Sequence, residues 1–251
     1  MKSKVALIIG AGTSLGTSIT KVFADENFVV VPVRRDGEQL KSLKLEINSK
    51  GGSCFPFSLD ARKEEDIVNV IEKVENDIGE IEVAVYNIGA NIKYNLAETT
   101  SKKYFKVWEM AAFGAFLMGR EVAKKMIERK RGTIIFTGAT ASVRGSDGFS
   151  AFASAKNAKR ALAQSMAREL GPKGIHVAHI IIDGAIDTPW VNEMFPEFVK
   201  LKKDIDGLMN PDDIASNYLW IHNQPKNAWT HELDLRPVSY THLRAHETRI
   251  H

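Results

Sequence analysis

The sequence predicts one α/β domain of the Rossmann type, in which helices cover both faces of a doubly wound parallel sheet. Three observations predict this fold class. Short apolar runs alternate with helix-like segments along the chain. A cluster of glycines directly follows the first run, and 251 residues suit a single sizeable domain. This domain is expected to span residues 1–237.

The apolar runs are typical of strands that are buried on both faces of a parallel sheet. In chain order they occupy residues 5–9, 28–33, 54–58, 83–86, 133–137 and 176–182, and a further strand-like segment lies at 232–235. Apolar residues at helical spacing indicate helices around residues 18–23, 67–74, 101–129 and 150–170. Right-handed crossovers between parallel strands then place helices on both faces.

A last helix is predicted from Asn210 to about His222. Asn210 is an N-cap residue, and proline with two acids follows it in the first turn.

Composition and charge exclude several partners and compartments. The chain carries 34 basic and 31 acidic side chains, for a formal net charge of +3. These charges are scattered, so neither a nucleic acid nor a membrane is predicted as a partner. Residues 1–10 read as a first strand without a signal-peptide cleavage site, and no apolar stretch approaches the roughly 20 residues of a membrane-spanning helix. Cys54, the single cysteine, is interpreted as a buried small hydrophobe. A cytoplasmic location is expected.

Residues 238–251 differ in character from the rest of the chain. They hold three of the seven histidines and show no apolar periodicity. They resemble a translated sequencing adapter, and they are interpreted as a non-native or disordered tail. His242 and His246 stand four residues apart and could share a helical face, but two histidines on a fraying terminus make a poor metal site. No metal is predicted.

The glycine cluster after the first strand indicates a dinucleotide site. Gly10, Gly12 and Gly16 lie between that strand and a helix, with Ser14 and Leu15 among them. Glycines there permit a tight turn and let the backbone approach a pyrophosphate at the helix N-terminus. The strand before and the helix after make a cofactor site a better reading than a bare turn.

The end of the second strand bears on the choice of cofactor. Arg34 and Arg35 stand where an NAD-binding protein places an acid against the ribose 2′-hydroxyl. Guanidinium groups match a 2′-phosphate in charge and geometry, so NADP(H) is preferred. NAD(H) remains possible, because the neighbouring Asp36 could be the ribose acid.

At this point the chain resembles the short-chain dehydrogenase/reductase family. The family pattern Gly-x-x-x-Gly-x-Gly matches at Gly10 and Gly16, with Ser14 at its middle glycine. Asp60-Ala61 resembles the family's acidic residue beside the adenine, and Asn87-Ile88-Gly89 resembles its Asn-Asn-Ala-Gly signature. The resemblance implies that Asp60 accepts the adenine amino group and that Asn87 braces the central strands.

The strongest match is the segment of residues 149–156, where the family carries Tyr-x-x-x-Lys. Lys156 is present, and Phe152 occupies the tyrosine position. The resemblance implies that the lysine lowers the tyrosine's pKa and holds the ribose while the tyrosine transfers a proton. Phenylalanine has no ionisable oxygen, so the usual proton relay cannot run through it.

Other catalytic positions depart in the same direction. The family's substrate-orienting serine falls on Thr140 or Ala139, and its helix asparagine falls on Ala111. Only Thr140 retains a hydroxyl. The candidate catalytic residues are therefore Lys156, Phe152 and Thr140.

After the sixth strand, Asp183-Gly184 stands where the family has Pro-Gly, and Thr188 matches the residue that meets the nicotinamide carboxamide. Asp183 is either a replacement acid/base or a turn-forming aspartate. Residues 188–206 are rich in large apolar side chains and form either a lid over the substrate pocket or packing for a partner subunit.

The function that this resemblance implies is an NADP(H)-dependent oxidoreductase with an atypical site, acting on a small carbonyl or alcohol. Its proton would come from Thr140 through water, from Lys156 or from Asp183. The alternative is a weak or inactive NAD(P)(H)-binding protein that acts as a sensor or partner module; non-redox chemistry on the scaffold is a third reading. A homodimer or homotetramer is expected through the helices at 101–129 and 150–170.

Overall fold

The structure is a computed structural model that describes residues 3–239. Its main sheet has eight strands in the order β10-β7-β6-β5-β1-β2-β3, with β4 also paired to β2. Every pairing in this sheet is parallel. The strands are β1 (Lys4–Ile9), β2 (Val29–Arg34), β3 (Ser53–Cys54), β4 (Phe57–Ser58), β5 (Glu80–Tyr86), β6 (Thr133–Thr137), β7 (His176–Ile182) and β10 (Glu232–Leu235). The strand order reverses at β1, which is where such sheets bind their ligands.

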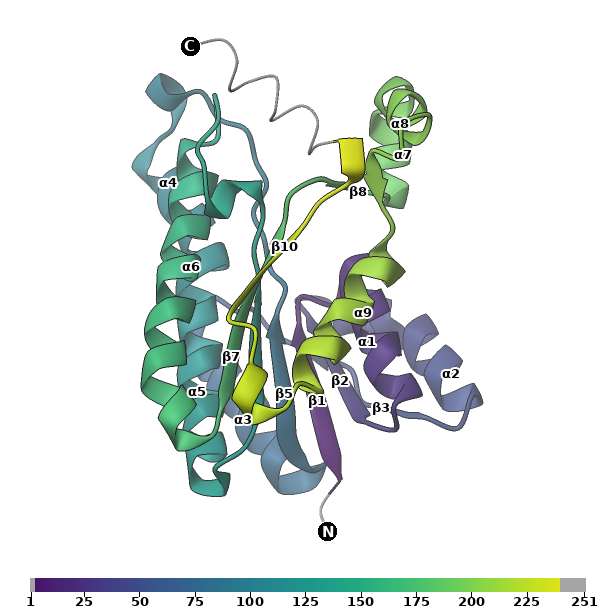
Figure 1. The fold of residues 1–251 in the computed structure, drawn as a ribbon, viewed down its shortest axis with the longest axis vertical. Helices are drawn as coiled ribbons and strands as arrows, with labels where there is room; N and C mark the ends of the chain where they lie inside the picture. Colours follow the sequence, from purple (N-terminus) through teal and green to yellow (C-terminus); the bar gives the residue numbers. More distant parts are fainter. Residues whose placement is uncertain (1–2, 240–251) are drawn as a thin grey trace.

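Helices cover both faces of the sheet (Figure 1). On one face, α1 (Leu15–Asp25), α2 (Lys41–Ser49) and α9 (Pro211–His222) pack on side chains that alternate along the strands. On the other face, α3 (Glu64–Asp77), α5 (Gly114–Arg129) and α6 (Ser150–Leu170) bury a second apolar cluster. The predicted doubly wound α/β fold is confirmed.

A small excursion stands beside the carboxyl ends of the strands. Helices α7 (Pro189–Met194) and α8 (Pro196–Lys203) lie between β8 (Ala185–Ile186) and β9 (Leu208–Met209), two short strands that pair in parallel. Figure 1 shows this excursion above α9, near the end at which that helix begins. The excursion contains residues 188–206, which the sequence predicts either as a lid or as packing for a partner subunit, and it is called the lid for brevity.

Two predicted strands differ from those observed. The run at 54–58 is divided into β3 and β4, because Pro56 has no N–H to donate to the ladder. The fifth strand begins at Glu80, three residues before the apolar run that predicted it. Its acids Glu80 and Glu82 look like surface residues in the sequence, but both pair with Arg131 from the loop before β6.

The predicted helix at 101–129 contains an irregularity. It runs as α4 (Ser101–Trp108), a π-helical turn η3 (Glu109–Phe113) and α5. The hydroxyl of Tyr86 donates a hydrogen bond of 2.6 Å to the carbonyl of Met110 within this turn. Such turns free a backbone carbonyl, and Tyr86 provides its partner.

Two smaller predictions are confirmed, those for Cys54 and Asn210. Cys54 is buried, and burial raises the pKa of its thiol to about 11. Asn210 caps α9 by accepting a hydrogen bond from the N–H of Asp212 at 2.9 Å.

No helix in the described part of the chain is long and apolar enough to cross a membrane. Among residues 3–239, no group of three or more metal-ligating side chains could hold an ion.

The predicted tail at 238–251 lies almost entirely outside the described residues. His242 and His246, the pair weighed as metal ligands, lie outside them as well.

One buried ion pair links α3, β5 and α5. The guanidinium of Arg129 donates to both carboxylate oxygens of Glu75 at 2.7 and 3.0 Å, and also to the carbonyl of Ile81 at 3.0 Å. The same carboxylate accepts the N–H of Ile81 at 3.0 Å. Glu75 is nearly inaccessible to solvent, so water does little to solvate its charge. The Glu75 carboxylate and the Arg129 guanidinium therefore neutralise each other.

Glu75→Ala is expected to lower the free energy of unfolding by about 3–5 kcal/mol, the usual cost of leaving one partner of a buried pair uncompensated. Urea denaturation at pH 7 measures this value. Glu128→Ala, an exposed change next to Arg129, should alter stability by less than about 0.5 kcal/mol. Equal effects of the two substitutions would contradict the role given to the Glu75 pair.

Candidate active site

The turn after β1 has the geometry of a phosphate-binding loop. Gly10 has a φ of 98°, and a Cβ there would lie 2.9 Å from the Ile88 backbone. A Cβ at Gly16 would lie 2.4 Å from the Gly10 carbonyl, so only glycine lets α1 approach the strand this closely. By contrast, a Cβ at Gly12 would meet nothing within 4 Å. Gly12 therefore faces open space.

The start of α1 leaves polar groups available to a ligand. Ser14 is the N-cap residue, but its hydroxyl makes no capping hydrogen bond. Its Oγ is buried and has no hydrogen-bond partner among the described residues. Leu15 begins the helix and is buried beneath the turn. A buried hydroxyl without a partner at a helix N-terminus suits an anionic oxygen.

The two arginines at the end of β2 differ. Arg34 is half-buried, and its Nη1 has no partner among the described residues. Arg35 is exposed. Asp36 accepts hydrogen bonds from the Glu38 N–H at 3.2 Å and from Gln39 Nε2 at 2.8 Å, so its carboxylate caps the short helical turn that follows.

Asp60 lies beyond β4 and is held by a residue that the sequence analysis missed. Arg62 Nε donates to both carboxylate oxygens of Asp60, at 2.9 and 3.2 Å. Hydrogen bonding from Arg62 lowers the pKa of Asp60 to about 2. Ala61 is buried beside it, and its carbonyl lies against Gly114. An adenine amino group at this site would share the carboxylate with Arg62.

Asn87 ties β5 to the glycine turn. Its Nδ2 donates to the Gly10 carbonyl at 3.1 Å, and its N–H donates to the Ile9 carbonyl at 2.8 Å. These bonds give Asn87 the bracing role that the family resemblance implies. A Cβ at Gly89 would lie 3.7 Å from Lys156 Nζ, which places the end of β5 beside the lysine.

Phe152 and Lys156 occupy neighbouring turns of α6. The Lys156 side chain is 3% exposed, and its Nζ donates to the carbonyls of Thr137 at 3.0 Å and Gly138 at 3.4 Å. The ammonium lies 5.5 Å from the centroid of the Phe152 ring, within cation–π range. Burial lowers the pKa of Lys156 to about 8.

Thr140 and Asp183 are brought together from different strands. The Thr140 hydroxyl donates to Asp183 Oδ1 at 2.6 Å, although 43 positions separate the two residues. Asp183 is fully buried at the end of β7, with Arg144 at 3.9 Å and Arg236 at 3.7 Å from its carboxylate oxygens. Sequence reasoning singled out the hydroxyl and the acid but missed both arginines.

The two other catalytic positions hold no polar side chain. Ala139 lies just before the η4 turn (Thr140–Ser142), and Ala111 is buried within the π-helical turn. Among the candidate catalytic positions, polar side chains therefore remain at Lys156, Thr140 and Asp183.

A second buried lysine was missed. Lys159 follows Lys156 by one turn and is fully buried, with its Nζ donating to the Ile88 carbonyl at 3.2 Å. The available signal was the spacing of three, which puts both lysines on one helical face.

Beyond β7 the chain enters the lid. Gly184 packs against Pro237 and Met209, where a Cβ would come within 3 Å of each. Thr188 caps α7, because its Oγ1 accepts the Val191 N–H at 3.1 Å. The apolar side chains of the lid are exposed, namely Trp190, Met194, Phe195, Phe198 and Leu201.

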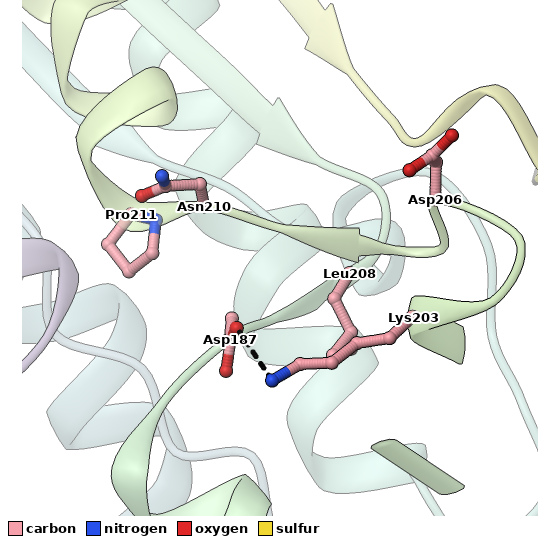
Figure 2. Close-up of a pocket in the computed structure, with 6 residues that line it drawn as sticks. All are labelled: Asp187, Lys203, Asp206, Leu208, Asn210 and Pro211. Atoms are coloured by element: carbon pink, nitrogen blue, oxygen red, sulfur yellow. Dashed lines mark ion pairs between the residues drawn. The ribbon is translucent and has the colours of Figure 1, made fainter. Parts of the chain in front are cut away.

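A pocket of about 300 Å³ lies at the base of the lid, next to Thr188 in sequence. Figure 2 shows its lining residues, which are Asp187, Lys203, Asp206, Leu208, Asn210 and Pro211. Lys203 Nζ points to Asp187 Oδ2 at 3.7 Å and so ties α8 to β8. None of the predicted site residues lines this pocket.

The residues at the carboxyl edge of the sheet fit a dinucleotide. The partnerless Ser14 hydroxyl and Arg34 nitrogen, together with the open space at Gly12, are what a phosphate-bearing ligand would use. Ser14 and Gly12 would face the pyrophosphate, and Lys156 would hold the ribose.

Comparisons with known proteins agree with this geometry. The family model for short chain dehydrogenase matches residues 4–197. A curated 3-oxoacyl-[acyl-carrier-protein] reductase from Bos taurus is 23% identical over 222 residues, which cover 88% of this chain and 92% of that protein.

Solved structures share the fold. A short-chain dehydrogenase from Rhodopseudomonas palustris is 44% identical, with a TM-score of 0.80 over 94% of this chain and 98% of that one. An actinorhodin polyketide ketoreductase with NADPH is 22% identical, with a TM-score of 0.83 over 94% of this chain and 96% of that one. The family match spans most of the chain, and the strand order and site geometry accord with it: the protein belongs to the short-chain dehydrogenase family.

Proposed function

We propose that the protein is an NADP(H)-dependent oxidoreductase acting on a small carbonyl or alcohol, with Lys156 in place of the missing tyrosine as the acid or base. The observation that carries this proposal is the environment of Lys156. Its amine is buried at the carboxyl edge of the sheet, and burial lowers its pKa to about 8. A group with a pKa near the working pH is suited to general acid–base catalysis.

The residues around Lys156 assign the other roles. When bound, the nicotinamide would supply or accept the hydride. Lys156 gives a proton to the substrate oxygen during reduction and takes one during oxidation. Thr140 commits its hydroxyl proton to Asp183 at 2.6 Å, so Thr140 has only its oxygen lone pairs to offer a substrate. We therefore assign Lys156 to moving the proton, and Thr140 with Asp183 to accepting a hydrogen bond from a donor group of the substrate such as a hydroxyl.

The preference for NADP(H) rests on Arg34. Its Nη1 is buried without a partner in the described part of the chain, and Asp36 is occupied by capping the next turn. A guanidinium with a free donor fits a 2′-phosphate better than a ribose hydroxyl. The similarity to a ketoreductase solved with NADPH supports the same preference.

One observation favours a second function, that of a weak or inactive NAD(P)(H)-binding sensor or partner module. Phe152, Ala139 and Ala111 all lack the polar groups of the family's proton relay. The loss of these groups removes the usual proton relay and leaves the cofactor-binding residues in place, which is what a binding protein without turnover would need.

Cofactor preference is measured by thermal denaturation with NADPH, NADP⁺, NADH or NAD⁺. NADPH at one hundred times its Kd should stabilise the fold by about 2.7 kcal/mol, with a smaller shift from NADH at the same concentration. Arg34→Ala is expected to weaken NADPH binding about 10- to 100-fold, the range of a charged hydrogen bond, and to leave NADH nearly unchanged. The distant Arg168→Ala is the control. No stabilisation by any of the four forms would remove the basis for both candidate functions.

Turnover is tested with NADPH and a panel of aldehydes and ketones. Wild-type protein should show slow reduction, and Lys156→Met should lower kcat/KM at least about 100-fold, the usual contribution of a positioned acid. Phe152→Tyr should raise kcat by restoring the relay. A wild-type protein that binds NADPH but is inert, while Phe152→Tyr is active, would favour the sensor.

We also propose a homodimer or homotetramer. Aromatic rings line the outer side of α4 and α5, where Phe113 stacks on both Trp108 and Phe116. Phe105 is 60% exposed and Phe116 is 39% exposed. Aromatic clusters of this kind are typical of interfaces.

Light scattering after size exclusion should therefore give the mass of a dimer or tetramer for the wild-type protein. The double variant Phe105→Glu with Phe116→Glu should be a monomer, whereas Leu45→Glu, at an exposed position on α2, should not change the mass. A monomeric wild-type protein would refute the assembly.

A further inference from the structure

Two buried lysines on α6 lie side by side beneath the site. Lys156 and Lys159 are separated by about one helical turn, so both side chains lie on the same face of α6. Lys159 is fully buried, with its Nζ 5.4 Å from the centroid of the Tyr86 ring. Within residues 3–239, no carboxylate pairs with either amine. The polar contacts of both are backbone carbonyls, at Thr137, Gly138 and Ile88.

Two amines in this setting cannot both carry a proton. Each ammonium would be desolvated and would repel the other, with no acid to offset the charge. One ammonium and one neutral amine, in contrast, form a hydrogen bond in which the ammonium donates. Burial first, and then the charge of Lys156, lower the pKa of Lys159 far below its ordinary value. Lys159 is therefore the neutral partner.

His179 on β7 is consistent with a single charge at this place. Its Nδ1 lies 3.1 Å from Glu232 Oε2, and Arg160 binds the same carboxylate at 2.7 and 2.6 Å. Hydrogen bonding from Arg160 lowers the pKa of Glu232, which is therefore ionised and accepts the proton of His179 Nδ1. The Nε2 lone pair is then bare, buried and without a partner among the described residues.

That lone pair faces the lysine end of the site. A Cβ on Gly138 would lie 2.5 Å from His179 Nε2, and the Gly138 carbonyl accepts a hydrogen bond from Lys156. Burial, the largest cause, lowers the pKa of His179 to about 4. The imidazole is thus neutral. Its Nε2 presents a lone pair toward the lysine end of the site and adds no positive charge there.

We propose that Lys159 is a positioning residue for the proposed acid: its neutral amine accepts a hydrogen bond from Lys156, and the two lysines share one proton. This inference rests on the proposed function only for its catalytic meaning. In reduction, Lys156 transfers the shared proton to the substrate oxygen, and the pair is left with two neutral amines. In oxidation, that neutral pair takes one proton from the alcohol oxygen.

The neighbouring titratable groups described next change protonation outside the range from pH 6 to 9. A titration within that range can therefore be assigned to the two lysines. Burial raises the pKa of Tyr86 on β5 and of Tyr218 on α9, whose hydroxyl contacts Thr137. His179 and Glu232 titrate below this range, and Arg160 stays charged because its bond to Glu232 raises its pKa.

The test is an NMR titration of the full-length protein with ¹³C-labelled lysine, which requires neither cofactor nor substrate. Two lysine signals should stand apart from the rest. One should titrate near pH 8 and disappear in Lys156→Met, and the other should titrate well below the ordinary lysine range and disappear in Lys159→Met. Ordinary titration of every lysine near pH 10.5 would overturn the proposal, whatever the outcome of the turnover assays.

The direction of the shift in Lys159→Met distinguishes a shared proton from other roles. Loss of the acceptor should lower the pKa of Lys156 by about one to two pH units, the size of a charge-assisted hydrogen bond. A rise toward 10.5 would mean that Lys159 is charged, and no change would mean that it only fills space; either result refutes the pair.

Lys159→Gln keeps an acceptor oxygen but cannot hold a proton, so it should return the pKa of Lys156 to near 8. The exposed Lys173→Met, just beyond the end of α6, is the control and should leave the Lys156 signal unchanged. Once a substrate is known, the basic limb of the kcat/KM profile should shift in Lys159→Met and recover in Lys159→Gln. Activity lost without any shift of that limb would count against the role.

Discussion

The structure depends on one constraint, the parallel direction of every pairing in the main sheet. Because no strand runs backwards, every strand delivers its last residue to the same edge. Gly10, Arg34, Asn87, Thr137 and Asp183 meet there although they are far apart in the sequence. The glycine turn then holds this edge together. The Gly10 carbonyl accepts a hydrogen bond from Asn87, and Gly16 packs closely against the same carbonyl. Substitutions at the catalytic positions leave this framework untouched.

Local sequence features predicted most of the fold, and long-range contacts account for what they missed. Buried strands can be recognised in the sequence as apolar runs, and the N-cap at Asn210 can be recognised from the residues that directly follow it. The start of β5 could not be predicted because Glu80 and Glu82 look like surface residues in the sequence. The arginine that neutralises them is about fifty residues away. At the site, the sequence identified Phe152 and Lys156 by spacing. It could not reveal that Lys159 is buried, because an isolated lysine on a helix normally reads as solvated.

The loss of the tyrosine changes the electrostatics of the site more than its shape. Phe152 remains packed against Phe149 and still covers Lys156, so the ring keeps water away from the amine. In a tyrosine-bearing site the lysine can remain a fixed cation that acidifies a phenol. Here the lysine is itself the proposed proton donor, and within residues 3–239 its amine contacts the carbonyls of Thr137 and Gly138 and no carboxylate.

The pairing of β8 with β9 has a consequence for how this scaffold diversifies. Two residues on each side join the ends of the lid excursion, and the Lys203–Asp187 contact closes it again at its base. The roughly 20 residues between β8 and β9 form a loop that these contacts close at its base and that lies apart from the main sheet. Insertions, deletions and side-chain changes in that loop can therefore be accommodated with little strain on the carboxyl edge of the main sheet.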